Sequence, residues 1–191
     1  MRIGILFEGK FDRDCLQILI SRILTGCVEQ LDFKEYPSEG SILDKIPAAM
    51  RSFFENNAVD LGVFVSDTDG ESGRRRLIED RISAQLKHNP QAEIVIGMPD
   101  QNFEQWFISE EVAIKSLYGL KSSDPLPFGE IRDPKKRLRE IHDNSEIGMI
   151  TRTKAYAALT QNLNLKLLEK DASYGRFAKE LREKAGCPGT K

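Results

Sequence analysis

Apolar runs that alternate with amphipathic helical patterns constrain the fold of this chain more than any other feature. The apolar runs predict four strands, over residues 2–7, 30–36, 60–66 and 93–98. Apolar side chains at three- and four-residue spacing predict three intervening helices, over residues 12–25, 41–56 and 73–88. Apolar strands that alternate with helices are typical of a mostly parallel sheet covered by helices on both faces. The sequence therefore predicts an α/β fold, Rossmann-like in type.

The pattern of apolar and polar residues changes after Pro99. Only helical patterns follow, over residues 102–108, 133–142, 151–165 and 174–184. A loop over 119–133 holds four glycine or proline residues and separates them. We therefore expect an α/β domain over residues 1–100 and a helical extension over 101–191 packed on it.

Length and charge set broad limits on function. A chain of 191 residues can bury a core without disulfides or structural metal. The formal net charge of −2 gives no overall basic field. This weakens a nucleic-acid hypothesis without excluding it, because an active site needs only a local basic surface.

The cysteines and the N-terminus bear on location. Cys15, Cys27 and Cys187 are odd in number, far apart and without zinc-like spacing, which fits a reduced cytoplasmic setting. Cys15 lies on the apolar side of its predicted helix, which favours core packing. The N-terminal apolar run is too short for a signal peptide or a membrane span. We expect a cytoplasmic protein with no membrane partner.

Acidic residues end two of the predicted strands. Glu8 follows the run "ILF", and Asp67 and Asp69 follow "VFVS". Ligands of parallel α/β sheets bind at the carboxyl ends of strands, so these carboxylates converge if their strands are neighbours. Because like charges repel, a bound cation would stabilise carboxylates that lie so close together. Oxygen ligands of this kind suit Mg²⁺ or Mn²⁺. The joint pattern predicts a metal site.

Simpler explanations exist for each acid alone. Glu8 could be favoured by the N-terminus of the helix that follows it. "DTDG" could be an ordinary aspartate-rich turn. Glu104, among aromatic residues, could join the metal site or point to solvent, and Asp100 could do no more than cap a helix.

Basic residues cluster twice, at 74–76 and at 135–137. Most such runs are solvated helix faces, but either could contact a nucleic-acid backbone. We expect the phosphate-contacting residues to include Arg74, Arg75, Lys135 and Lys136. Both histidines, His88 and His142, lie in polar helical stretches and are expected on the surface.

"LFEGKFDRD" followed by "VFVSDTDG" resembles the Toprim domain of topoisomerases, bacterial primases and OLD-type nucleases. The resemblance implies that Glu8 is a general acid or base and that Asp67 and Asp69 hold Mg²⁺. Gly9 and Asp12 match the small and acidic residues that often follow the glutamate in Toprim-like nucleases.

The remaining motifs resemble the DUF4276 family. The matching residues are Pro99, Phe103, Glu104 and Trp106, then Pro134 and Lys135, then Ser173 and Phe177. The proline-to-tryptophan stretch carries one or two extra residues, and the last pair fits loosely. Members of that family are suspected nucleases, often encoded beside an ATPase in genome-defence clusters, which implies a separately encoded ATPase partner.

Three other families fit less well. Haloacid-dehalogenase phosphatases place Asp-x-Asp-Gly after the first strand, whereas here it follows the third. Receiver domains need an acid pair after the first strand and a lysine after the fifth, and neither is found. Restriction nucleases would have a lysine near Glu104, where this chain has Trp106.

The leading hypothesis is a metal-dependent nuclease that hydrolyses phosphodiester bonds in DNA or RNA. Glu8, Asp67 and Asp69 are the expected catalytic residues and metal ligands, with Glu104 as an extra ligand. The alternative is a non-catalytic Toprim-like module that binds a partner ATPase or nucleic acid.

Overall fold

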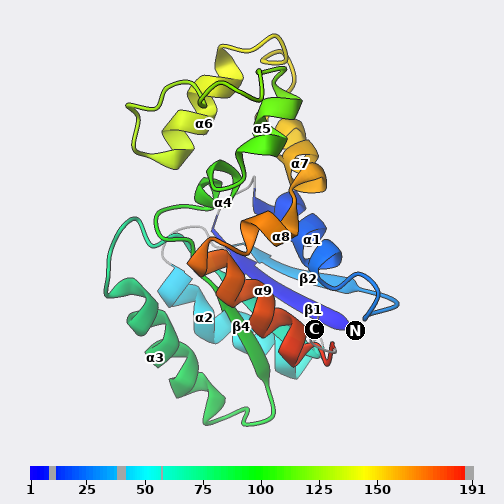
Figure 1. The fold of residues 1–191 in the computed structure, drawn as a ribbon. Helices are drawn as coiled ribbons and strands as arrows, with labels where there is room; N and C mark the ends of the chain where they lie inside the picture. Colours follow the sequence, from blue (N-terminus) through cyan, green and yellow to red (C-terminus); the bar gives the residue numbers. More distant parts are fainter. Residues whose placement is uncertain (9–11, 38–41, 57, 188–191) are drawn as a thin grey trace.

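The chain forms a four-stranded parallel sheet between layers of helices (Figure 1). The structure is a computed structural model that describes residues 1–8, 12–37, 42–56 and 58–187. The strands are β1 (Arg2–Phe7), β2 (Asp32–Pro37), β3 (Leu61–Val65) and β4 (Glu93–Gly97). They lie in the order β2-β1-β3-β4, and every neighbouring pair is parallel. The predicted α/β class is confirmed.

The helices lie close to the predicted segments. The first half of the chain holds α1 (Asp12–Ile23), α2 (Ile42–Met50), the π-helical η1 (Arg51–Asn56) and α3 (Arg74–Leu86). The second half holds α4 (Glu104–Ile108), α5 (Glu111–Leu117), α6 (Pro134–Asp143), α7 (Arg152–Asn162), α8 (Leu165–Leu168) and α9 (Ala172–Lys184). Pro47 lies inside α2 rather than at its start, and α5 is a helix that the sequence patterns did not predict.

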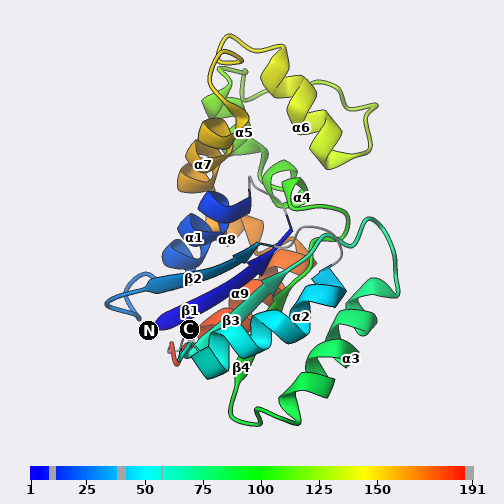
Figure 2. The ribbon, with the colours of Figure 1, turned by 180° about the vertical axis from the view of Figure 1, so that it is seen from behind.

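β1 and β3 bury both faces, as their apolar runs predict, whereas in the edge strand β2 Asp32 is exposed and residues 33–35 are only partly buried. Ile3, Ile5 and Phe7 belong to a core shared with α1 and α9, whereas Leu6 belongs to a second core shared with α2 and α3. Successive side chains of a strand point to opposite faces, so one six-residue strand serves both cores. Figure 2 shows α2 and α3 on the face opposite α9.

Gly4 lies where the second core comes closest to the sheet. A Cβ atom at this position would lie 2.6 Å from the Phe53 ring, which is fully buried and packs at a tilt against Phe64. The absence of a side chain therefore lets the aromatic ring of η1 rest directly on β1.

The C-terminal half covers two regions of the sheet. Helices α4 to α7 lie beyond the carboxyl ends of the strands, and α9 then returns to cover one face (Figures 1 and 2). Phe177 of α9 approaches Gly97 of β4 and stacks on Trp106 of α4, with ring centroids 5.3 Å apart. Residues on both sides of position 100 thus share one core.

Two expectations about single residues are wrong. Cys27 and Cys187, 160 residues apart in the chain, form a disulfide, so these cysteines are not the unpaired thiols expected of a reduced protein. Cys15 is free and buried, as predicted. His142 is buried rather than exposed, with its two ring nitrogens against the Tyr118 hydroxyl and the Ile150 carbonyl.

Within the described residues, no helix is long and apolar enough to cross a membrane.

Candidate functional site

Glu8 and Asp67 come together because β1 and β3 are neighbours. Glu8 directly follows β1, and Ser66 and Asp67 directly follow β3. The chain leaves β1 for the outer strand β2 and then crosses back to β3, so the strand order reverses between β1 and β3. The crevice at such a reversal is where open α/β sheets bind ligands. The strand ends that carry Glu8 and Asp67 therefore lie side by side at one edge of the sheet, as the prediction requires.

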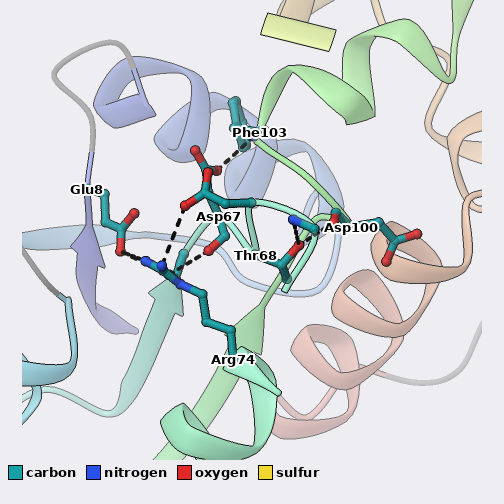
Figure 3. Close-up of polar contacts among 9 residues, drawn as sticks. Glu8, Asp67, Thr68, Arg74, Asp100 and Phe103 are labelled. Atoms are coloured by element: carbon teal, nitrogen blue, oxygen red, sulfur yellow. Dashed lines mark hydrogen bonds and ion pairs between the residues drawn. The ribbon is translucent and has the colours of Figure 1, made fainter. Parts of the chain in front are cut away.

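A guanidinium group lies between two of the acids (Figure 3). Arg74, the first residue of α3, donates through Nη2 to Glu8 Oε1 at 3.0 Å. Its Nη1 lies 3.5 Å from Asp69 Oδ2. The Arg74 and Glu8 side chains are 21% and 22% exposed, whereas that of Asp69 is 63% exposed. The Glu8 contact is therefore the stronger one, because water screens it less.

Ser66 orients the Glu8 carboxylate. Its hydroxyl donates to the same Oε1 atom at 3.0 Å, from the end of the neighbouring strand. Oε1 thus accepts from a hydroxyl and a guanidinium, which fixes the plane of the carboxylate. The sequence analysis did not single out Ser66, although it directly precedes Asp67.

The Asp67 side chain faces the start of α4. Its Oδ1 accepts a hydrogen bond from the backbone N–H of Phe103 at 2.9 Å (Figure 3). The loop after β3 is also tied to the loop after β4, because the Asp69 N–H donates to the Gln101 carbonyl at 2.8 Å and the Thr68 hydroxyl donates to the Asp100 carbonyl. Asp100 itself is exposed and does not cap α4.

The "DTDG" segment is also a tight turn. Asp69 and Gly70 have φ values of 51° and 77°, in the left-handed region that glycine and aspartate tolerate best. The explanation of this motif as an aspartate-rich turn is therefore confirmed, and the metal-site explanation stays a prediction.

The donor set suits a hard cation, but the present side-chain positions surround an arginine. Carboxylates and hydroxyls are the ligands that Mg²⁺ and Mn²⁺ prefer. Among the described residues, no three His, Cys, Asp or Glu side chains are placed to hold one ion. Because Glu8 and Asp69 already share a positive group, a metal would take the place of the Arg74 guanidinium. Gly9 lies outside the described residues.

Glu104 lies in different surroundings. It is 6% exposed and lines a pocket of about 200 Å³ together with Lys135 and Lys136. The structure thus joins the predicted extra ligand to two of the predicted phosphate-contacting residues. That pocket is completed by four residues that were not singled out from the sequence: Asp133, Arg139, Arg152 and Tyr156.

Arg75, another of the predicted phosphate-contacting residues, lies beside the "DTDG" turn. Arg75 forms an ion pair with Glu79 at 2.7 Å and lines a second pocket, of about 230 Å³. That pocket also includes Thr68, Asp100 and Arg176, so a cation from α9 reaches the same edge.

Comparison with known protein families, with curated proteins and with solved structures gave no match.

Proposed function

We propose that the protein is a metal-dependent nuclease that hydrolyses phosphodiester bonds of DNA or RNA. The observation that carries the proposal is that Glu8 and Asp69 converge on one positive group where the strand order reverses. Two carboxylates that share a cation position are suited to exchange that group for Mg²⁺ or Mn²⁺. Asp67, next to them, is the third expected ligand.

The ion would stabilise the charge that develops on the phosphate and acidify an attacking water. The chain itself supplies Glu8 as the base: the Ser66 hydroxyl holds Oε1, which faces the cation position, and the other carboxylate oxygen, Oε2, would accept the proton. Arg74, once released from Glu8, can donate to a phosphate oxygen.

The surroundings of the site favour a polyanionic substrate. Lys135 and Lys136 line the pocket next to α4, where cations outnumber acids. Arg75 and Arg176 line the pocket beside the turn, together with the acids Glu71 and Asp100. A local basic surface of this kind can bind nucleic acid despite a net charge of −2. A separately encoded ATPase partner is a part of the proposal that rests on the family resemblance. A cytoplasmic setting is another part, for which the Cys27–Cys187 disulfide removes the argument from unpaired cysteines.

A cleavage assay tests the proposal directly. Single- and double-stranded DNA and RNA are incubated with the protein in Mg²⁺, in Mn²⁺ and in EDTA. We expect cleavage with metal, none in EDTA, and a loss of at least about 100-fold in Glu8→Gln, which removes the base but keeps the side-chain size. Glu146→Gln is the matched control, because Glu146 is an exposed acid outside the site.

One observation favours the second candidate, a non-catalytic module that binds an ATPase or nucleic acid. Arg74 already compensates the charge of Glu8, so the acids can be stable without metal. Nucleic-acid binding that metal does not affect, with no cleavage under any of these conditions, would establish this alternative.

A further inference from the structure

The pocket at Glu104 is formed by three helices that lie beyond the carboxyl ends of the strands. Lys135, Lys136 and Arg139 come from the first turns of α6, Arg152 and Tyr156 come from α7, and Glu104 begins α4. The three basic residues of α6 are exposed, whereas Glu104 and Tyr156 are 6% and 4% exposed. The pocket therefore has a basic rim and a buried floor. Its three helices lie beyond the carboxyl ends of the strands (Figure 1).

The charge of the pocket is positive. Four cationic side chains line it, against the two acids Glu104 and Asp133, which leaves a formal charge of +2. Asp133 is engaged as the N-cap of α6: its Oδ1 accepts from the backbone N–H groups of Lys135 at 2.9 Å and Lys136 at 3.2 Å. Because those N–H groups are used, a bound anion would be held by side chains and not by the helix terminus.

The floor of the pocket contains a hydrogen-bonding group that stays protonated. Burial, and then the negative charge of Glu104, raise the pKa of Tyr156. The phenol is therefore a neutral hydroxyl throughout the physiological range. Glu104, Arg152 and Tyr156 all line the pocket, so a buried hydroxyl, an acid and a cation share its surface.

We propose that this pocket binds a terminal phosphate monoester. A monoester carries a charge of about −1.5 to −2 near pH 7, which complements the formal +2 of the pocket. Its three terminal oxygens can each accept from lysine and arginine donors. A compact pocket with a buried floor accommodates the end of a chain, whereas an internal phosphodiester needs an open groove that the strand can enter and leave.

The pocket is linked to the acidic site by the start of α4. Phe103, whose N–H donates to Asp67, directly precedes Glu104, and the Asn102 side chain donates to Asp133 at 3.2 Å. A strand whose phosphorylated end occupies the pocket would therefore be directed along the edge that carries Glu8 and Asp67. This direction of the substrate rests on the proposed function, to which the inference adds a substrate class: nucleic-acid strands with a terminal phosphate.

Binding measured in EDTA tests the pocket without requiring catalysis. Fluorescence anisotropy compares one labelled oligonucleotide sequence with a 5′-phosphate, with a 3′-phosphate and with hydroxyl ends, and adenosine monophosphate and inorganic phosphate are added as competitors. We expect one phosphorylated end to bind at least about tenfold more tightly than the hydroxyl form, the order of one charge-assisted hydrogen bond. Competition by the mononucleotide at concentrations similar to the oligonucleotide would identify free nucleotides as the source of the phosphate.

A matched pair of variants assigns the preference to the pocket. Lys136→Ala/Arg139→Ala removes two charges from the rim and should abolish the preference. Lys154→Ala/Lys166→Ala removes two exposed charges outside the pocket and should preserve it, because Lys154 lies two residues after Arg152 and faces away from it. Equal melting temperatures show that both variants are folded.

The possible outcomes separate the two proposals. Equal affinity of wild type for phosphorylated and hydroxyl ends, or an unchanged preference in Lys136→Ala/Arg139→Ala, overturns the phosphate site. Metal-dependent cleavage without end preference leaves the nuclease standing and removes only this inference. End preference without any cleavage keeps the phosphate site and removes the nuclease.

Discussion

Arg74→Ala should raise the affinity of the protein for Mn²⁺. On the proposed function, the guanidinium must leave Glu8 before the carboxylate can bind a metal. The Glu8 contact, at 3.0 Å between side chains about four-fifths buried, is a charge-assisted hydrogen bond of about 1.5–3 kcal/mol. The Asp69 contact, at 3.5 Å and largely exposed, adds little. Since about 1.4 kcal/mol is tenfold, the affinity should rise by roughly 10- to 150-fold.

Isothermal titration calorimetry with Mn²⁺ measures this change, and thermal unfolding with and without EDTA supports it. In EDTA, Arg74→Ala should be less stable than wild type by about 1–2 kcal/mol, because Glu8 loses its partner, and added Mn²⁺ should reverse the loss. Arg76→Ala is the control, since Arg76 is 87% exposed and its ion pair with Asp80 is long, at 3.9 Å, and therefore weak. If wild type and Arg74→Ala bind Mn²⁺ equally tightly, the ion does not compete with Arg74 and the metal site lies elsewhere.

Two further predictions concern stability. Asp67→Ala should lower the free energy of unfolding by about 1–3 kcal/mol in EDTA, because the Phe103 N–H loses its acceptor, whereas Asp67→Asn keeps an acceptor and should be close to wild type. Urea denaturation measures both, and a stabilised Asp67→Ala would show that repulsion among the acids outweighs this hydrogen bond. Cys27→Ser/Cys187→Ser should cost about 2–5 kcal/mol under oxidising conditions, because the disulfide closes a loop of 160 residues. Dithiothreitol should lower the melting temperature of wild type to that of the variant, and a wild type that reductant does not affect would argue against a stabilising disulfide.

The fold class could be predicted because it depends on local periodicity. β1 and β3 read as apolar runs since both of their faces are buried, and the observed strands lie within about two residues of the predicted ones. The acids that follow β1 and β3 were predicted to lie at one sheet edge, because the carboxyl ends of parallel strands meet at the same edge. That prediction still required β1 and β3 to be neighbours, which the sequence left open and the sheet order supplies.

The partners of the charged side chains could not be predicted. The sequence placed Arg74 close to Asp69 along the chain, but its stronger contact is with Glu8, 66 residues away. His142 was expected on the surface because its neighbours in the sequence are polar, yet it is buried between Tyr118 and Ile150. In both positions the local sequence describes a helix face, and only the packing of other helices shows what covers it.

The sequence by itself therefore determined the elements, their alternation and the acids at the strand ends. The tertiary structure decided that an arginine lies between those acids, that four basic residues and a buried tyrosine share one pocket, and that Cys27 meets Cys187. The physical reason is the range of the interactions. Helix and strand periodicity repeats every few residues, so it can be recognised in the local sequence. A hydrogen bond, an ion pair or a disulfide requires atoms within a few ångströms, and among 28 basic and 30 acidic side chains only the folded backbone selects which ones meet.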